Sequence, residues 1–238
     1  MKKTALIIGA SGDIGSAIAT NLIENGYFTY LHYHRDITTI QKFENKYGSE
    51  NIVKIQADLS DTKGVKILQD TITRNIDTLI YTAGTSFYGL MTEIEEEAKQ
   101  NMIQLNVTSL YSAIQAFLPS MVTNKTGNIV VISSIWGEIG ASCEVLYSMV
   151  KGAQISFVKA LAKEVAPSGI RVNAVAPGAV QTKMLHHFTE EEKKSIAEEI
   201  PMGRFASPKE IAETVSFLIS SKASYTTGQI LGVNGGWN

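Results

Sequence analysis

Short apolar runs alternate with stretches of helical spacing along all 238 residues of the chain. A run of roughly four to eight apolar residues between turn signals is typical of a strand buried on both faces, and parallel strands need long crossover connections, usually helices. Such crossovers are right-handed. The alternation therefore predicts an α/β fold, a doubly wound parallel sheet of about seven strands with helices on both faces. The expected strands are residues 4–8, 27–33, 51–56, 78–82, 128–132, 171–175 and 230–233.

The first apolar run ends in a glycine turn. Gly9, Gly12 and Gly15 follow it, and apolar residues resume at helical spacing over residues 17–23. This order of strand, glycine turn and helix lets backbone N–H groups and the positive end of the helix approach a pyrophosphate, because glycine has no side chain to obstruct it. The turn indicates a Rossmann-type dinucleotide site, and a plain glycine-rich turn is the alternative.

A second pattern combines Ser134, Tyr147 and Lys151. Tyr147 and Lys151 are four residues apart in a stretch of helical spacing, so they stack on one face of a helix. A free phenol has a pKa of about 10, and a cation about 4 Å away would lower it toward neutral pH. Ser134 would hydrogen-bond a substrate oxygen and stabilise the charge that develops there. The triplet predicts proton transfer to a carbonyl. The alternative is an exposed helix face with an extended lysine.

One residue of each pattern, and three further residues, come directly after predicted strands. Gly9, Asp58, Ala83, Ser134 and Pro177 each lie just past the end of an apolar run. In a doubly wound sheet the ligand crevice lies outside the carboxyl ends of the strands. We therefore expect these residues, which are far apart in the sequence, to converge on one rim of the sheet.

Composition narrows the classes of function. A net charge of -2 offers no basic stripe for nucleic acid, and the apolar runs are too short to span a membrane. The single cysteine, Cys143, excludes an internal disulfide and favours a reducing cytoplasm. Adjacent His186 and His187 have no nearby third ligand, so we expect no metal site. The length and a 44% hydrophobic content fit one domain over residues 1–238.

Further motifs occur in order along the chain: Ala57-Asp58-Leu59, Thr82-Ala83-Gly84, Leu105-Asn106-Val107, Val175-Ala176-Pro177-Gly178 and Val233-Asn234-Gly235-Gly236. With the glycine turn and the Ser-Tyr-Lys triplet, they make the whole chain resemble the short-chain dehydrogenase/reductase family. The resemblance is greatest to its 3-oxoacyl-[acyl-carrier-protein] reductases of fatty acid biosynthesis. It implies an NAD(P)-binding oxidoreductase with a substrate lid at about residues 180–206, and a cytoplasmic homotetramer built partly from the Tyr147 helix.

The resemblance also implies roles for four catalytic residues. Tyr147 would be the general acid that gives its proton to the carbonyl oxygen while nicotinamide delivers hydride to the carbon. Lys151 would bind the nicotinamide ribose and lower the pKa of the phenol, and Ser134 would position the carbonyl. Asn106 would anchor a water of the proton relay through a helix break or its carbonyl group. An asparagine that caps a helix kink is a second interpretation of Asn106, and both can hold together.

The cofactor contacts are likewise implied by the resemblance. Asp58 would approach the adenine edge, and the alternative is that it caps the strand end together with Ser60 and Asp61. The full set of implied contacts is Gly9, Ser11, Gly12, Asp13, Ile14, Gly15, His34, Arg35, Asp58, Leu59, Thr82, Ala83, Gly84, Tyr147, Lys151, Pro177, Gly178, Val180 and Thr182.

Two departures from the family pattern stand out. The usual glycine spacing is Gly-x3-Gly-x-Gly, and here Asp13 occupies the position of the middle glycine. Because a carboxylate would repel a pyrophosphate, we expect Asp13 to face solvent or to cap its own helix. Tyr81 and Thr82 replace the usual asparagines before Ala83-Gly84. We therefore expect that strand end to be braced differently.

The choice of cofactor depends on the end of the second strand. An acid there would bind the free ribose hydroxyl of NAD, but this chain has Tyr33, followed by His34 and Arg35. An arginine can bind the 2′-phosphate of NADP with its guanidinium fork. We therefore expect NADP(H). Against this, Gly12 stands where many relatives that use NADP have a second basic residue, and Arg35 could instead pair with Asp36.

The substrate is predicted less sharply. Thr189 with Glu192 and Ser207 with Glu210 read as capping boxes, so the lid should contain short helices. Met184, Leu185, Phe188, Ile196 and Met202 would contact an acyl chain or simply pack the lid on the body. An acidic carrier protein needs basic docking residues. The resemblance places one of them at Lys125, and Ser168 stands at a second such position. The expected reaction is NADPH-dependent reduction of a carrier-linked 3-oxoacyl thioester. The alternatives are another ketone, aldehyde, diol or sugar, and a non-catalytic NADP-binding sensor.

Overall fold

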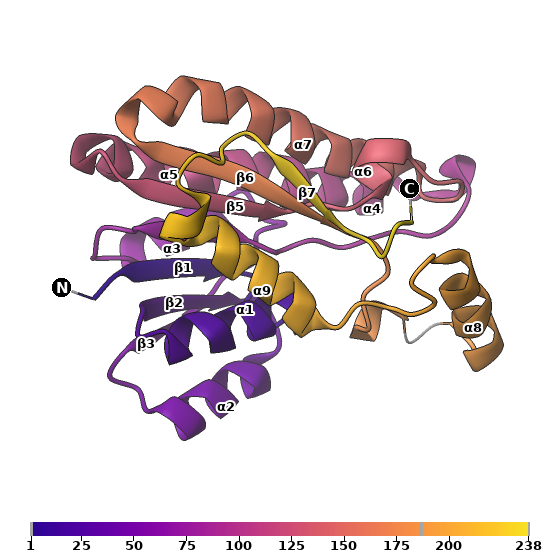
Figure 1. Cartoon of the computed structure of the whole chain (residues 1–238), viewed down its shortest axis with the longest axis horizontal. Helices are drawn as coiled ribbons and strands as arrows, with labels where there is room; N and C mark the ends of the chain where they lie inside the picture. The colour runs from indigo at the N-terminus through magenta and orange to yellow at the C-terminus, as the bar shows by residue number, and fades with distance from the viewer. Residues whose placement is uncertain (1, 186–187, 238) are drawn as a thin grey trace.

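The strands lie side by side in one parallel sheet. The computed structural model describes residues 2–185 and 188–237, with the backbone alone at Met184. Within these residues a seven-stranded sheet has the order β3-β2-β1-β4-β5-β6-β7, with every neighbouring pair parallel (Figure 1). Every end lies within two residues of the expected one, and the expected fold class is confirmed. The strands are β1 (Thr4–Ile8), β2 (Phe28–Tyr33), β3 (Ile52–Gln56), β4 (Thr78–Tyr81), β5 (Gly127–Ile132), β6 (Ile170–Pro177) and β7 (Ile230–Val233).

Helices cover both faces of the sheet. One face packs against α1 (Asp13–Glu24), α2 (Ile37–Tyr47) and α9 (Pro208–Ile219). The opposite face packs against α3 (Gly64–Thr71), α5 (Ser109–Asn124) and α7 (Val145–Val165), and Figure 1 shows α5 and α7 together on that side. All residues of β1 and β2 are buried, because successive side chains of each strand enter the two cores in turn. No helix in the described part of the chain is both long and apolar enough to cross a membrane.

The strand order creates a crevice beside the first strand. The chain runs outward from β1 to β2 and β3, and then crosses to β4 on the other side of β1. At this reversal the connections leave in opposite directions, which opens a crevice at the carboxyl ends of β1 and β4. The glycine turn after β1, the loop after β4 and Ser134 after β5 all meet this edge of the sheet.

A helix break occurs on the way to α5. The helix α4 (Glu96–Ile103) passes through a π-helical turn, η2 (Gln104–Thr108), before α5 begins. Such turns add one residue per turn and are frequent at functional sites. Asn106 lies within this turn and is fully buried. The predicted helix break is therefore present at Asn106.

The segment between β6 and α9 projects from the body of the molecule (Figure 1). It contains η4 (Lys183–Leu185) and α8 (Glu190–Glu199), and an isolated bridge joins Val180 to Ala206 at its two ends. Both expected capping boxes form, at Thr189 with Glu192 and at Ser207 with Glu210. The segment thus leaves and rejoins the body at one neck. It covers residues 180–206, where the sequence predicts a lid, and we refer to it by that name.

Asp13 binds this lid and not its own helix. Its Oδ2 accepts a hydrogen bond of 2.6 Å from the backbone N–H of Lys183. The N-cap of α1 is Gly12, where no side-chain cap forms, so the expectation that Asp13 caps α1 is wrong. Its carboxylate lies at the exposed surface, as the other expectation has it, and binds Lys183 there. The ammonium of Lys183 lies 3.7 Å from Asp36 Oδ2. Two carboxylates, Asp13 after β1 and Asp36 after β2, therefore hold the first turn of the lid through Lys183.

Replacing Asp13 with alanine should loosen the first turn of the lid. The substitution removes the acceptor of the Lys183 N–H, and a hydrogen bond to a charged group contributes on the order of 1.5 kcal/mol. We expect the Lys183 amide to exchange with deuterium about tenfold faster, as measured by NMR. The control Asp13→Asn keeps an acceptor oxygen at this place and should exchange nearly as slowly as the parent. Equal exchange in the parent and Asp13→Ala would show that the contact does not hold the lid.

Candidate active site

The glycine turn packs tightly on its surroundings at two of its three glycines. A Cβ on Gly9, where φ is +88°, would lie 2.6 Å from the Thr82 hydroxyl, and a Cβ on Gly15 would collide with the Gly9 carbonyl oxygen. A Cβ on Gly12 would meet nothing closer than that same oxygen, at 3.5 Å. Gly9 and Gly15 thus let α1 approach the end of β1, and Gly12 keeps the outer surface of the turn open. This arrangement fits the pyrophosphate of a dinucleotide.

Two polar side chains brace the turn from below. The Thr82 hydroxyl lies 2.9 Å from the Ile8 carbonyl oxygen and 3.1 Å from that of Gly9. His32 Nδ1 accepts from the Gly9 N–H at 3.0 Å, so its Nε2–H donates to the Ala57 carbonyl at 3.0 Å. Burial lowers the pKa of His32 to about 4, which keeps the ring neutral in this role. Thr82 stands where the family pattern has an asparagine, and these contacts show how it braces the end of β4 in this chain.

Ser134, Tyr147 and Lys151 come together at the carboxyl edge of the sheet. Ser134 follows β5, and the other two side chains lie one turn apart on α7. Ser134 hydrogen-bonds the Tyr147 phenol, and the Lys151 Nζ lies 5.6 Å from the centroid of the Tyr147 ring. Lys151 is 4% exposed, and its ammonium donates to the Ile132 carbonyl at 2.9 Å. The alternative of an exposed helix face with an extended lysine is therefore wrong.

The electrostatics of the pair differ from the expectation. Burial, and then the charge of Glu144, raise the pKa of Tyr147 to about 12, although its hydrogen bond with Ser134 acts in the opposite direction. Burial lowers the pKa of Lys151 to about 7. The prediction that Lys151 brings the Tyr147 pKa down toward neutral is wrong for this structure. The site is dry enough to penalise the charged form of each group, and the ammonium is bound to a strand-end carbonyl.

Asn106 is held by its own helix break and by α7. Its Nδ2 donates to the Met102 backbone carbonyl at 2.9 Å, and its backbone carbonyl oxygen accepts from Gln154 Nε2 at 2.8 Å. Its Oδ1 is buried and has no hydrogen-bond partner within the described chain. A Cβ on Gly84 would lie 2.8 Å from this oxygen and 3.5 Å from Lys151 Nζ. The loop after β4 thus passes close to both groups, and only a glycine leaves the required space.

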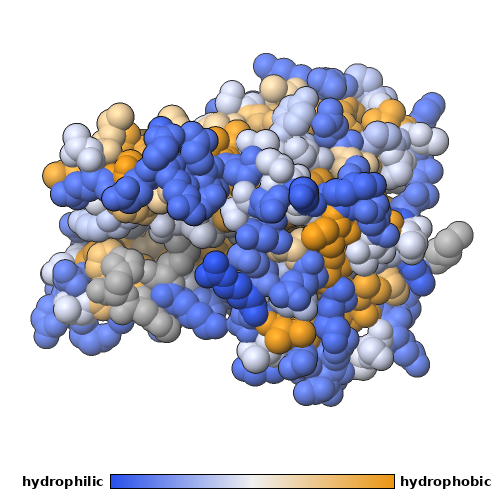
Figure 2. Space-filling model, turned by 180° about the vertical axis from the view of Figure 1, so that it is seen from behind, coloured by the Kyte–Doolittle hydropathy of each residue, from blue (hydrophilic) through white to orange (hydrophobic). Residues whose placement is uncertain are grey.

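A cavity of about 860 Å³ contains the triplet and opens beside the lid. Figure 2 shows the molecule from behind, and on the side of the lid apolar atoms line a hollow that has polar atoms at its rim. Ten of the predicted site residues line the cavity: Ile14, Thr82, Gly84, Ser134, Tyr147, Lys151, Pro177, Gly178, Val180 and Thr182. The others lie outside its wall. They are Gly9, Ser11, Gly12, Asp13, Gly15, His34, Arg35, Asp58, Leu59, Ala83 and Asn106. The Leu59 side chain belongs to the hydrophobic core.

The outer part of the predicted cofactor site lies at the ends of β2 and β3. His34 Nε2 is 3.4 Å from Asp58 Oδ2, and Asp58 Oδ1 accepts from the Ser60 N–H at 2.9 Å, so the capping interpretation of Asp58 holds for Ser60. Asp36 caps α2 through Thr38 and Thr39 and pairs with Lys183. Arg35 is exposed and makes no ion pair with any described residue, so the alternative pairing with Asp36 is absent.

Aromatic and lid side chains form the apolar wall of the cavity. Leu185, Phe188 and Ile196 line it as expected, whereas Met202 is 63% exposed and does not. The Met184 side chain, His186 and His187 lie outside the described residues. The described residues contain no group of three His, Cys, Asp or Glu side chains that could hold a metal ion. Sequence reasoning missed three aromatic residues of the wall, Tyr88, Trp136 and Trp237.

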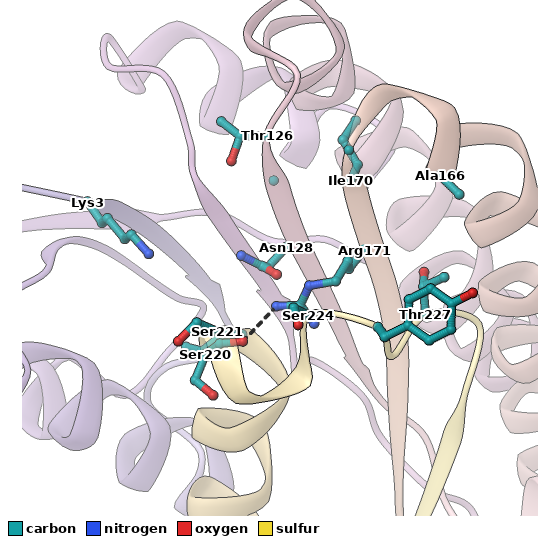
Figure 3. A pocket seen from close by; sticks show the side chains of 14 residues that line it. Lys3, Thr126, Asn128, Ala166, Ile170, Arg171, Ser220, Ser221, Ser224 and Thr227 are labelled. Atoms are coloured by element: carbon teal, nitrogen blue, oxygen red, sulfur yellow. Dashed lines mark hydrogen bonds between the residues drawn. The ribbon is translucent and has the colours of Figure 1, made fainter.

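The opposite edge of the sheet has a second cavity, of about 660 Å³. In Figure 3 the Arg171 guanidinium turns toward the end of α9, where it donates to the Ser220 and Leu218 carbonyls. This arginine therefore satisfies a helix end, and none of the predicted site residues line this cavity. Lys125 lies at this same edge, because it ends α5 just before β5 begins. It is not beside the entrance of its own chain's site.

Comparison with known proteins finds relatives over nearly the whole chain. Residues 9–238 match a protein-family model described as enoyl-(acyl carrier protein) reductase. An uncharacterized oxidoreductase of Bacillus subtilis is 54% identical over 241 residues, which cover 100% of both chains. A 3-oxoacyl-[acyl-carrier-protein] reductase of Staphylococcus aureus is 33% identical over 241 residues, which cover 99% of this chain and 98% of that protein.

A solved structure agrees with the fold. The crystal structure of a 3-oxoacyl-[acyl-carrier protein] reductase from Brucella melitensis superposes with a TM-score of 0.91 at 30% identity, and covers 99% of this chain and 91% of that one. The chain therefore belongs to the short-chain dehydrogenase/reductase family of oxidoreductases, which bind a nicotinamide cofactor.

Proposed function

We propose that this protein reduces the ketone of a 3-oxoacyl thioester to the 3-hydroxyacyl form with NADPH. The observation that carries the proposal is the meeting of Ser134, Tyr147 and Lys151 in one cavity beside the open glycine turn. The relatives from Staphylococcus aureus and Brucella melitensis are 3-oxoacyl-[acyl-carrier-protein] reductases, which supports the substrate class. Residues 1–238 would act as one domain, with the segment over residues 180–206 as its lid.

Tyr147 is the general acid of the proposed reaction. The bound nicotinamide supplies the hydride that reaches the carbonyl carbon. The Ser134 hydroxyl donates to the carbonyl oxygen, and the Tyr147 phenol gives that oxygen its proton as negative charge develops. Because the pKa of Tyr147 is raised to about 12, the phenol is protonated at neutral pH and ready to act as an acid. Alcohol oxidation needs the phenolate, so the same pKa favours reduction near neutral pH.

Lys151 stabilises the phenolate that remains after proton transfer. A buried negative charge is costly, and a nearby ammonium lowers that cost. Burial lowers the pKa of Lys151 to about 7, so the charge of this lysine responds to the groups around it. Ribose hydroxyls are acceptors for its remaining N–H. The ammonium therefore links the bound dinucleotide to the acid that protonates the substrate.

The charge at the cavity entrance bears on whether a carrier protein delivers the substrate. Glu191, Glu192 and Glu199 of α8 line the cavity, and an acidic carrier protein would meet these carboxylates at the entrance. Lys125 would help to dock a carrier only from a neighbouring subunit. Exposed apolar side chains on α5 and α7, such as Tyr111 and Met149, support a homotetramer in which neighbours cover them. The acidic entrance favours a second candidate, a small carbonyl compound that no carrier protein holds.

Tyr147→Phe should abolish turnover without loss of cofactor binding. The substitution removes the proton donor, and general acid catalysis contributes on the order of 10²- to 10⁴-fold. The loss of absorbance at 340 nm with NADPH and an acetoacetyl thioester measures turnover, and fluorescence titration measures NADPH binding. Tyr225→Phe, at a fully exposed tyrosine, is the control and should keep parental activity. Parental turnover by Tyr147→Phe would contradict the assigned acid.

Arg35→Ala should weaken the use of NADPH and spare that of NADH. Arg35 is exposed near the end of β2, where the guanidinium can bind the 2′-phosphate that NADH lacks. We expect kcat/KM for NADPH to fall about tenfold or more, and kcat/KM for NADH to change about twofold at most. Lys42→Ala removes an exposed cation of α2 and should change neither value. A parent enzyme that prefers NADH would contradict the assignment of NADP(H).

A further inference from the structure

The helix α7 carries a third buried polar side chain beside the catalytic pair. Gln154 is 1% exposed and lies three residues after Lys151, so it shares the face on which Lys151 follows Tyr147. Its Oε1 accepts from Lys151 Nζ at 3.1 Å. Its Nε2 donates to the Asn106 carbonyl oxygen at 2.8 Å. One amide thus joins the ammonium on α7 to the π-helical turn η2.

This bridge fixes the orientation of the amide. An ammonium has only donors and a backbone carbonyl has only acceptors. If the Gln154 amide were rotated by half a turn, its NH2 would face the ammonium and its oxygen would face the Asn106 carbonyl. Both contacts would then be repulsive. Only the observed orientation satisfies both neighbours. A carboxylate here would satisfy the ammonium alone, and an apolar side chain would satisfy neither neighbour.

We propose that Gln154 is a positioning residue, whose amide links the Lys151 ammonium to the backbone carbonyl of Asn106 in η2 and stabilises the charged form of the lysine. The role rests on the proposed function, because Lys151 matters only if the phenol beside it transfers a proton. The resemblance to the family implies a relay water at the Asn106 carbonyl, and here an amide group binds that oxygen. Two of the three N–H groups of Lys151 are bound, by Ile132 and Gln154. The third is left for a ligand.

The pKa of Lys151 depends on the groups that face its ammonium. From β5 it faces the Ile132 carbonyl, and from η2 and the loop after β4 it faces the neutral Asn106 and Gly84. The titratable groups nearby are Tyr147 on α7 and Glu144 at the cap of that helix. Because an acceptor stabilises the charged form of a lysine, loss of the Gln154 oxygen must lower the pKa of Lys151. A carboxylate at the same place must raise it.

Variants at position 154 test the proposal directly. Gln154→Met keeps the length of the side chain and removes both hydrogen bonds, whereas Gln154→Glu keeps the shape and adds a negative charge. NMR follows the titration of Lys151 through its side-chain ¹³Cε signal, assigned by its loss in Lys151→Arg. We expect the titration midpoint of Lys151 to fall by about one pH unit in Gln154→Met and to rise by about one unit in Gln154→Glu. Gln41→Leu, at an exposed glutamine of α2, is the control and should leave the midpoint unchanged.

Enzyme kinetics provide a second readout. In Gln154→Met we expect kcat at neutral pH to fall about tenfold, with the alkaline limb of its pH profile moved to lower pH, and the KM for the carbonyl substrate to change less than about twofold. Unchanged Lys151 midpoints, or shifts in the same direction in both variants, would overturn the proposal. If Gln154→Met does not fold, as judged by circular dichroism, the upward shift in Gln154→Glu decides alone. If the parent reduces no carbonyl, the proposed function fails and the NMR titration still tests Gln154.

Discussion

The close approach of the glycine turn to its neighbours is the constraint on which the rest of the site depends. At Gly9 and Gly15 the backbone leaves no space for a Cβ, so the start of α1 can lie directly against the ends of β1 and β4. Thr82 and the neutral ring of His32 fix the turn in this position. Because the turn ends beside the loop after β4, the dinucleotide cradle and the catalytic side chains share one crevice.

Lys151 is held by partners outside the Ser134, Tyr147 and Lys151 triplet. Lys151 is bound to the Ile132 carbonyl and to Gln154, and Gln154 is bound in turn to Asn106. The same packing that fixes these groups removes water from them. Burial raises the pKa of Tyr147 and lowers that of Lys151, so both groups favour their neutral forms. The protonated phenol is the form that can donate a proton to a carbonyl oxygen.

The sequence predicted the sheet well because its signals are local. Apolar runs and glycine turns reveal strand ends within two residues, and the residues expected after those ends lie along the carboxyl edge of the sheet. Ser134 and Pro177 among them line the cavity. Interactions between distant segments were not predictable in this way. The bond from Asp13 to Lys183 spans 170 residues, and the Gln154 bridge depends on how α7 packs against η2. His32 gave a signal, a polar residue within an apolar strand, but its partner could not be known.

The predicted direction of the Tyr147 pKa shift was wrong because this shift also depends on packing between distant segments. Spacing shows that Tyr147 and Lys151 share a helix face, but it does not show how dry the face is or which way the ammonium turns.

The most direct test of hydride transfer at this site uses NADPH deuterated at nicotinamide C4 and a 3-oxoacyl thioester, with mass spectrometry and NMR of the product. Our account predicts deuterium on the hydroxyl-bearing carbon, delivered to one face alone. Cofactor binding without deuterium transfer to any of a panel of carbonyl compounds would contradict it.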